Sequence, residues 1–339
     1  MKQLNIGIIG AGRIGKVHMK SITYSVPGAK VLGITDVFPD ALPALAAEYG
    51  IEKIYPDYKA MLADPEIDAV LVCSSTDTHA DISIDAAKAG KHVFCEKPVD
   101  LTPEKVLAVI AAVKEAGVKL QVGFNRRFDH NFAHIRELIN EGKIGKLELV
   151  KITSRDPEPP PAQYAAVSGG IFLDMTIHDF DMACFIAGSE VDEVYVNATC
   201  LVDPAIGEAG DVDTAIISLK FKNGAIGVID NSRRAAYGYD QRVEVFGSLG
   251  MAADENDGDS TVKLSTASGV VGEKPQFFFL ERYMASFTEE MRQFIKAITE
   301  DTDVPVGIHA GLMSVVLAKA AKKSLDEHRP VKISEIAQA

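Results

Sequence analysis

The first 124 residues alternate short apolar runs with segments of helical periodicity. Each apolar run is followed by a segment whose apolar residues recur every three or four positions, which predicts a strand and then a helix. Strands that alternate with helices in this way form a parallel, doubly wound sheet. The predicted strands are 4–9, 29–35, 69–73, 92–96 and 120–124, and the predicted helices are 14–25, 39–49, 78–89 and 103–116.

The pattern changes in the second half of the chain, where strands come to follow one another without helices between them. This predicts an α+β domain with one large open sheet, mixed or antiparallel. A chain of 339 residues is long for one domain, so we expect a first domain over 1–124 and a second domain over 125–339. The predicted helices here are 128–141, 281–300 and 309–327, and the predicted strands are 147–154, 191–201, 214–221, 225–233, 241–246, 251–254 and 262–265.

An open sheet with helices on one face leaves its other face in need of a cover. Apolar residues of the predicted strands are candidates for that second face, and a second copy of the chain would cover it. We therefore expect a homo-oligomer, with a tetramer favoured. The candidates are Ile216, Leu219, Ile226, Val228 and Val243.

A glycine motif stands between the first predicted strand and the first predicted helix. Residues 10–15 read Gly-Ala-Gly-Arg-Ile-Gly and match G-x-G-x-x-G in the context that gives this motif meaning. Gly10 makes the tight turn, Gly12 lets a pyrophosphate approach the backbone, and Gly15 lets helix and strand pack closely. The helix N-terminus then faces the phosphates, so we expect Arg13 and Ile14 among the cofactor contacts; a plain glycine-rich turn is the alternative.

The second predicted strand ends in Asp36, 21 residues after Gly15. An acidic residue at this spacing accepts hydrogen bonds from the ribose hydroxyls and repels a 2′-phosphate. The next residue is Val37 and not an arginine. The sequence therefore favours NAD over NADP, against the alternative that Asp36 only ends a strand.

Polar residues follow the later strands of the first domain, at the edge where doubly wound sheets bind ligands. Lys97 follows an apolar strand directly and precedes a proline. A lysine there can hydrogen-bond a substrate oxygen and stabilise developing negative charge, although an exposed surface lysine is the alternative. His79 is expected to be a helix-start residue near the nicotinamide and not a catalyst. The expected cofactor contacts at this edge are Ser74, Ser75, Thr76, His79, Glu96 and Lys97.

Residues 168–181 (SGGIFLDMTIHDFD) carry ionisable side chains in an apolar segment that reads as a helix. Asp174, His178 and Asp181 have the spacing i, i+4, i+7, which puts them on one helical face. Burying such groups without partners costs about 2–7 kcal/mol each. They form either a structural polar cluster or a proton-transfer site, with His178 as base or acid and Asp174 holding its tautomer. Asp181 then remains as a structural anchor on the same face, or as a contact away from the reacting carbon.

Charge and composition exclude several classes of partner and site. A net charge of −13 without a basic run argues against nucleic acid and anionic membrane surfaces. No run of about 18 apolar residues predicts a membrane span, and the apolar stretch near the N-terminus is too short for a signal peptide. The four cysteines are scattered in apolar segments, which favours buried reduced thiols, and the histidines are dispersed. We expect a cytoplasmic protein without a metal site.

These motifs together resemble the Gfo/Idh/MocA oxidoreductase family over essentially the whole chain. The resemblance rests on Gly10–Gly15, Asp36, Glu96-Lys97-Pro98 and the segment 168–181. That last segment, with Arg155-Asp156-Pro157 before it, is similar to the members that oxidise inositol. The resemblance implies NAD-dependent oxidation of myo-inositol at its axial hydroxyl to 2-keto-myo-inositol. Residues 1–124 would then bind NAD as a Rossmann domain, and residues 125–339 would bind the substrate and form the oligomer contacts.

The resemblance also implies a catalytic set of Lys97, Asp174 and His178. His178 would remove the hydroxyl proton while hydride leaves the same carbon, Lys97 would hydrogen-bond the oxygen, and Asp174 would orient substrate and base. Arg127 and Tyr237 would contact the polyol, with Arg126 and Tyr239 as neighbouring candidates. Two alternatives stay open: a dehydrogenase of another cyclic polyol or sugar (scyllo-inositol, an inositol derivative, an aldose), and a non-catalytic NAD-sensing regulator.

Overall fold

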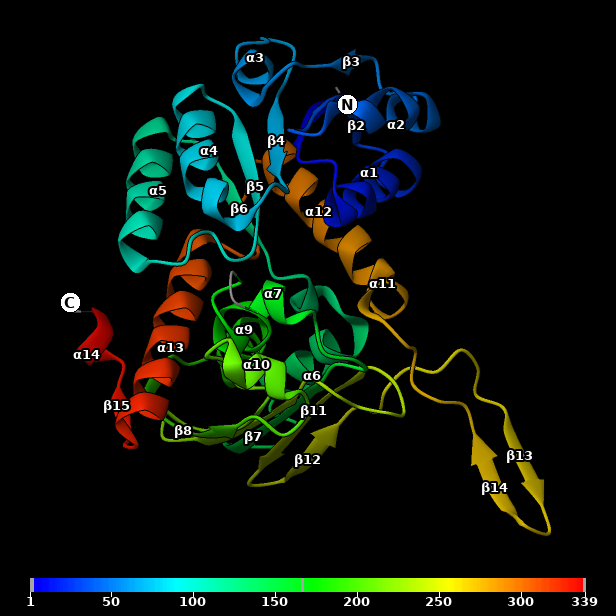
Figure 1. Cartoon of the computed structure of the whole chain (residues 1–339), viewed down its shortest axis with the longest axis vertical. Helices are drawn as coiled ribbons and strands as arrows, with labels where there is room; N and C mark the ends of the chain where they lie inside the picture. The colour runs from blue at the N-terminus through cyan, green and yellow to red at the C-terminus, as the bar shows by residue number, and fades with distance from the viewer. Residues whose placement is uncertain (1–2, 166–167, 338–339) are drawn as a thin grey trace. The chain divides into compact units, whose positions relative to one another are not determined.

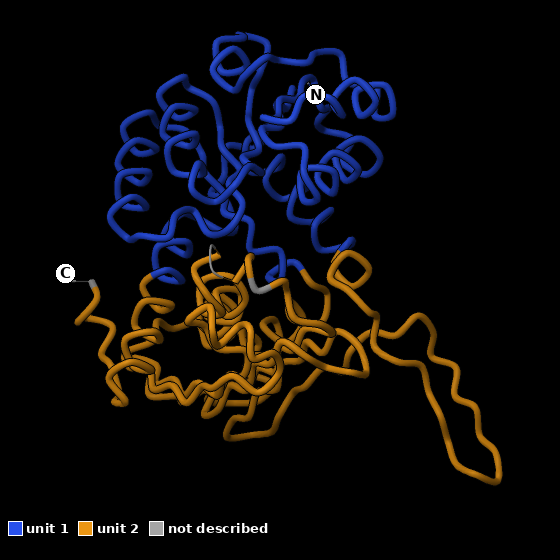
Figure 2. The backbone as a smooth tube through the Cα atoms, in the orientation of Figure 1, with its two compact units in different colours: residues 1–128, 284–315 blue, residues 129–283, 316–339 orange. Residues whose placement is uncertain are grey.

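The computed structural model describes residues 3–165 and 168–337. The chain divides into two compact units, one of residues 1–128 and 284–315 and the other of residues 129–283 and 316–339 (Figure 2). The sequence predicts a single boundary after residue 124. In the structure, residues 284–315 return to the first unit. That return has a packing cause, because Met291, Phe294 and Ile295 lie in the hydrophobic core of the first unit.

The first unit contains a six-stranded sheet with every pair of neighbours parallel, as predicted. Its order β3-β2-β1-β4-β5-β6 reverses direction between β1 and β4. In doubly wound sheets ligands bind outside the carboxyl ends of the strands at such a reversal. The strands are β1 (Leu4–Ile9), β2 (Ala29–Thr35), β3 (Lys53–Ile54), β4 (Ala69–Val72), β5 (His92–Glu96) and β6 (Leu120–Gly123).

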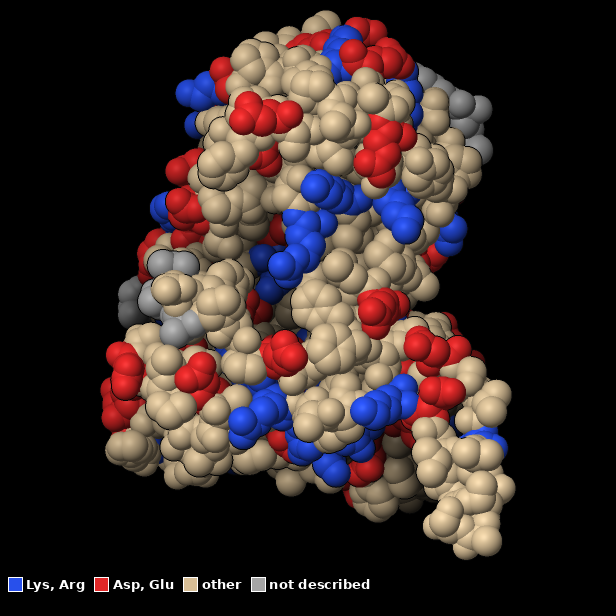
Figure 3. Space-filling view, turned by 45° about the vertical axis from the view of Figure 1, so that its right-hand side comes forward, with Lys and Arg blue, Asp and Glu red and all other residues tan. Residues whose placement is uncertain are grey.

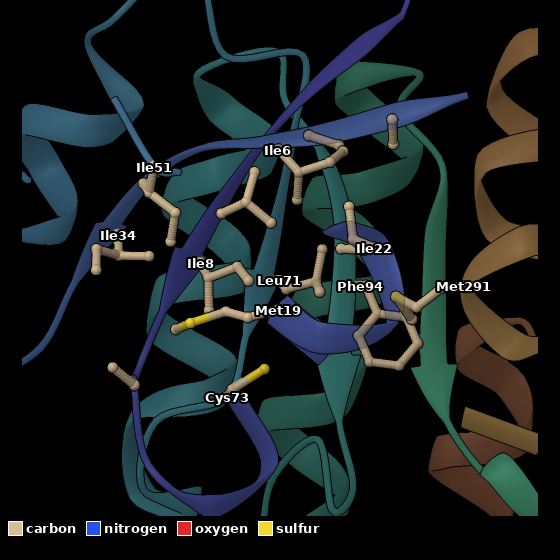
Figure 4. Close-up of a cluster of buried hydrophobic side chains, with 14 of the residues drawn as sticks. Ile6, Ile8, Met19, Ile22, Ile34, Ile51, Leu71, Cys73, Phe94 and Met291 are labelled. Carbon is tan, nitrogen blue, oxygen red and sulfur yellow. The ribbon is translucent and has the colours of Figure 1, made fainter. Parts of the chain in front are cut away.

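Helices flank this sheet (Figure 1), and buried apolar residues of α1, α2 and α12 complete its core. Figure 4 shows Ile6 and Ile8 of β1 beside Met19 and Ile22 of the first helix, with Met291 reaching the same cluster from near the C-terminus. The predicted helix 281–300 is two helices, of which only the second belongs to the first unit. The helices are α1 (Arg13–Ser25), η1 (Pro39–Ala41), α2 (Leu42–Tyr49), α3 (Tyr58–Leu62), α4 (Thr76–Lys88), α5 (Pro103–Ala116), η2 (Asn125–Phe128) and α12 (Met284–Thr299).

The second unit is built on a seven-stranded sheet of order β12-β11-β7-β10-β9-β8-β15. β10 runs parallel to β7 and the other neighbours are antiparallel, which makes the sheet mixed, as predicted. Its strands are β7 (Leu147–Arg155), β8 (Val191–Thr199), β9 (Thr214–Phe221), β10 (Ile226–Ser232), β11 (Asp240–Gly247), β12 (Gly250–Ala253) and β15 (Val331–Lys332). The other elements are α6 (His130–Asn140), α7 (Ala162–Ala165), α8 (Ile171–Asp174), α9 (Thr176–Ala187), α10 (Pro204–Glu208), α11 (Phe279–Arg282), α14 (Ser334–Ala337), the hairpin β13 (Lys263–Thr266) and β14 (Gly269–Gly272), and α13 (Ile308–Glu327), which continues from the first unit.

One face of this sheet is covered, since α9 packs on β7 and β10. Ile216 and Ile226 are exposed on the other face and Val228 is half-buried there. Leu219 and Val243 were expected on that open face but are buried. Side chains alternate along a strand, and Ile226 pairs with Lys220, so Leu219 must point to the covered side.

Candidate functional site

The glycine turn after β1 meets the steric needs of a dinucleotide-binding turn. Gly10 has φ +99°, and a Cβ atom on it would lie 2.6 Å from the backbone of Cys73 and Ser74. A Cβ on Gly15 would lie 2.1 Å from the carbonyl oxygen of Gly10, so the helix can approach the strand only with glycine there. A Cβ on Gly12 would meet nothing within 4 Å, which leaves its backbone open to a ligand.

The start of α1 suits an anionic ligand. Gly12 is its N-cap, no side chain of the described residues caps it, and the first turn holds no acidic residue. The N–H groups of that first turn therefore face outward from the helix end, where they can bind phosphate oxygens.

Asp36 lies beside this turn. Its carboxylate accepts the N–H of Ala11 at 2.6 Å and the N–H of Phe38 at 2.8 Å. The open backbone of Gly12 and the carboxylate of Asp36 thus fit the pyrophosphate and ribose of NAD.

The segments that follow β4 and β5 are held together by a buried histidine. His79 on α4 places Nδ1 2.8 Å from the carbonyl oxygen of Pro98 and Nε2 3.0 Å from that of Ser74. The hydroxyl oxygens of Ser74 and Thr78 lie 2.7 Å apart. Ser75 is the N-cap of α4. His79 therefore joins the two segments that follow β4 and β5 by contacts with their backbone.

Glu96 and Lys97 differ in their surroundings although they are neighbours in the chain. Glu96 is buried, and its Oε1 lies 2.7 Å from Nε2 of His18 on α1, a contact that the sequence did not predict. Lys97 is half-buried and its peptide bond to Pro98 is cis. Arg127 in η2 is half-buried and Arg126 is buried. Exposure therefore favours Arg127 for ligand contact.

The helix predicted within residues 168–181 is broken. α8 ends at Asp174, Met175 lies between the helices with φ −100° and ψ −60°, and α9 begins at Thr176. Asp174 and His178 are half-buried on the two sides of this break, whereas Asp181 is buried. One continuous helical face therefore does not carry the three residues.

A buried hydrogen-bond network anchors α9, the helix of His178, to the sheet. The hydroxyl of Thr176 donates to Oδ1 of Asn231 at 2.6 Å. The Nδ2 of Asn231 donates to Asp179 at 2.9 Å and to the carbonyl oxygen of Ser154 at 3.2 Å. These bonds fix the first turn of α9 on β10 and β7.

Asp174 is held by residues that the sequence prediction missed. Both terminal nitrogens of Arg233 lie 3.2 Å from Oδ2 of Asp174, and the hydroxyl of Tyr164 donates to Oδ1 at 3.0 Å. Arg233 is the last residue of the predicted strand 225–233, just as Lys97 directly follows a strand. A charged residue at the end of a strand was the feature of the sequence that could have indicated Arg233 as a site residue.

Tyr237 lies in a different hydrogen-bond group of the second unit. Its hydroxyl donates to Oδ2 of Asp240 at 2.5 Å and accepts from Nη1 of Arg155 at 3.1 Å. Burial, with the hydrogen bond to Asp240, raises the pKa of Tyr237. Tyr239 is buried with its ring edge-on to Tyr283. Of the two tyrosines, Tyr237 is the exposed one.

Within residues 3–165 and 168–337, no three His, Cys, Asp or Glu side chains are grouped so as to hold a metal ion. Nor does any helix in these ranges have the length and apolar character needed to cross a membrane. Cys73 and Cys95 are buried as expected, whereas Cys184 and Cys200 are only half-buried.

Known proteins are similar to this chain over almost its full length. Residues 4–124 match the model of an oxidoreductase family with an NAD-binding Rossmann fold, and residues 132–253 match the GFO/IDH/MocA C-terminal domain. The myo-inositol 2-dehydrogenase of Thermotoga maritima is 51% identical over 98% of this chain and 99% of that protein.

Two solved structures are also similar. A myo-inositol dehydrogenase of Corynebacterium glutamicum has a TM-score of 0.93 at 38% identity, covering 97% of this chain and 98% of that one. The scyllo-inositol dehydrogenase of Lactobacillus casei, solved with NAD(H) and scyllo-inositol, has a TM-score of 0.92 at 30% identity, covering 98% and 100%.

Proposed function

Because this chain belongs to the Gfo/Idh/MocA oxidoreductase family, we propose that it oxidises myo-inositol to 2-keto-myo-inositol with NAD. The observation that carries the choice of substrate is the similarity, over almost the full length of both chains, to a myo-inositol 2-dehydrogenase. The polar side chains of Asp174, His178 and Tyr237 in the second unit support this substrate, because a ring with many hydroxyls needs several hydrogen-bonding partners. The scattered cysteines support a cytoplasmic location.

In this proposal three side chains act on the hydroxyl that is oxidised. His178 accepts its proton as general base, and Lys97 donates a hydrogen bond to the oxygen while negative charge develops there. Asp174, fixed by Arg233 and Tyr164, orients His178 and the substrate. NAD, when bound, accepts the hydride. Arg127 and Tyr237 complete the proposed polyol contacts.

The test is a turnover screen of the purified protein with NAD, followed by NADH absorbance. The panel contains myo-inositol, scyllo-inositol, inositol derivatives and aldoses. The highest kcat/KM for myo-inositol supports the proposal, and a higher value for another polyol or sugar replaces the substrate. NAD binding without turnover of any compound would indicate the regulator instead.

We further infer that the second unit contacts another copy of the chain, in a homotetramer. The hairpin of β13 and β14 projects from the second unit (Figure 1). Every residue in both strands is exposed. Its surface is largely uncharged in the face drawn in Figure 3. The apolar side chains of Val262, Leu264, Val270 and Val271 are 63–68% exposed. A two-stranded hairpin is marginally stable alone, so these side chains need a partner surface.

The open sheet face offers such a surface, since Ile216, Ile226, Phe246 and Met251 are 44–55% exposed. Light scattering measures the molar mass in solution. A mass of four chains, falling when Leu264 and Val271 are replaced by lysine, supports the tetramer. A monomer at micromolar concentration contradicts it.

A further inference from the structure

A buried guanidinium lies next to the proposed catalytic carboxylate in the second unit. Arg233 directly follows β10, its side chain is 1% exposed, and its backbone N–H donates to the carbonyl oxygen of Asp213 at 2.9 Å. Its two terminal nitrogens both lie 3.2 Å from Oδ2 of Asp174. Arginine is suited to this position because its planar fork fixes a carboxylate in direction as well as in place.

Arg233 also reaches the other end of α8. Its guanidinium lies 4.0 Å from Oδ2 of Asp211, whose Oδ1 accepts the N–H of Ile171, the first residue of α8, at 3.0 Å. Asp174 is the last residue of the same helix. Arg233 therefore ties both ends of this single helical turn to the end of β10.

The remaining oxygen of Asp174 has a donor as well. The hydroxyl of Tyr164 on α7 donates to Oδ1 at 3.0 Å. A third carboxylate, that of Asp156, lies 4.0 Å from the guanidinium. Without Arg233, three carboxylates would face one another without this cation, and Oδ2 of Asp174 would lose both of its hydrogen bonds from the guanidinium.

We propose that Arg233 is a positioning residue for the oxidation, acting through Asp174. It fixes the carboxylate in one orientation, so that Asp174 in turn sets the geometry of His178 and the substrate hydroxyl. This inference rests on the proposed function, because Asp174 and His178 have their roles only there. An error of about 1 Å in such a group costs about 100-fold in rate.

The test is a double-mutant cycle with Arg233→Met and Asp174→Asn, measured as kcat with NAD and myo-inositol. Arg233→Met lowers kcat about 10- to 100-fold in the wild-type background, and less than about 3-fold when Asp174→Asn is present. The KM for NAD stays within about 2-fold, because the cofactor motifs lie in the first unit. Arg233→Lys, which keeps the charge without the fork, recovers part of kcat.

Arg282 supplies the matched control. Its side chain is 2% exposed, it donates to Asp129, and Nη1 lies 3.1 Å from Asp257. Arg282→Met removes an equally buried guanidinium between carboxylates. It therefore controls for the loss of thermal stability that Arg233→Met would cause. Its effect on kcat is the same with and without Asp174→Asn, because it does not act through that residue.

The outcomes separate this inference from the proposed function. If the wild type turns over a compound of the panel and Arg233→Met lowers kcat equally in both backgrounds, the positioning role alone is overturned. The same holds when that compound is a polyol or sugar other than myo-inositol. If Arg233→Met does not fold, the same cycle with Arg233→Lys decides. Absence of turnover with every compound of the panel overturns the proposed function and this inference with it.

Discussion

Replacing Gly12 by alanine separates cofactor binding from folding in the first unit. Gly12 has φ −69° and ψ −161°, a conformation open to any residue, and the added Cβ meets no atom within 4 Å. Alanine restricts the unfolded chain, which stabilises the folded protein by about 0.4–1 kcal/mol. Gly12 is also the N-cap of α1, where alanine is less favourable than glycine, so the two effects oppose each other and the apo protein should unfold at about the same temperature. The methyl group would stand where the pyrophosphate approaches the backbone. NAD should bind at least about 10-fold more weakly, which is about 1.4 kcal/mol.

Gly15→Ala is the matched comparison. Its Cβ would lie 2.1 Å from the carbonyl oxygen of Gly10, whereas ordinary contacts begin at 3.4 Å. The start of α1 must move by about an ångström, and overpacking of this kind costs about 1–3 kcal/mol. Gly15→Ala should therefore lower both the unfolding temperature and the affinity for NAD.

Calorimetric titration with NAD and thermal unfolding of the apo protein measure the two quantities. Loss of binding with unchanged unfolding in Gly12→Ala, and loss of both in Gly15→Ala, is the expected pattern. An affinity of Gly12→Ala equal to that of the wild type would refute the placement of the pyrophosphate over this turn.

His178→Ala should lower kcat at least about 100-fold by loss of the general base, with NAD affinity unchanged in titration; near-normal turnover would contradict the role of His178. Asp36→Ser should weaken NAD binding and raise the ratio of kcat/KM for NADP to that for NAD, because it removes repulsion of the 2′-phosphate; an unchanged ratio would count against the ribose contact. Burial alone raises the pKa of Asp213, but hydrogen bonds, including those from the N–H groups of residues 201–203, outweigh it and hold the pKa at about 2. Because this lies below the unfolded pKa of about 3.9, the stabilisation is present above that value and lost as the pH falls through 2. Urea titrations measure the difference in free energy of unfolding between the wild type and Asp213→Asn. This difference should fall by about 2 kcal/mol from pH 5 to pH 2, and an equal difference at both pH values would contradict the assignment.

The sequence by itself determined the features that depend on local periodicity and backbone conformation. The strand, glycine turn and helix at residues 4–25 were predicted almost to the residue, as were β2, β5 and β9. Apolar spacing and glycine positions act within one turn or one strand, so they are readable without tertiary contacts. Asp36 belongs here too, because its distance from the glycines along the chain sets its place beside them.

Tertiary structure decided which side chains meet across long separations. Arg233 binds Asp174 from 59 residues away and Glu96 lies on His18 from 78 residues away. The sequence predicted that Leu219 and Ile226 lie in strands, but strand register decided which face each side chain occupies. The return of α12 to the first unit likewise depends on packing. Local pattern thus determined the elements and the cofactor motif, whereas strand pairing and packing decided the surroundings of Asp174, because these bring together residues that no spacing in the sequence connects.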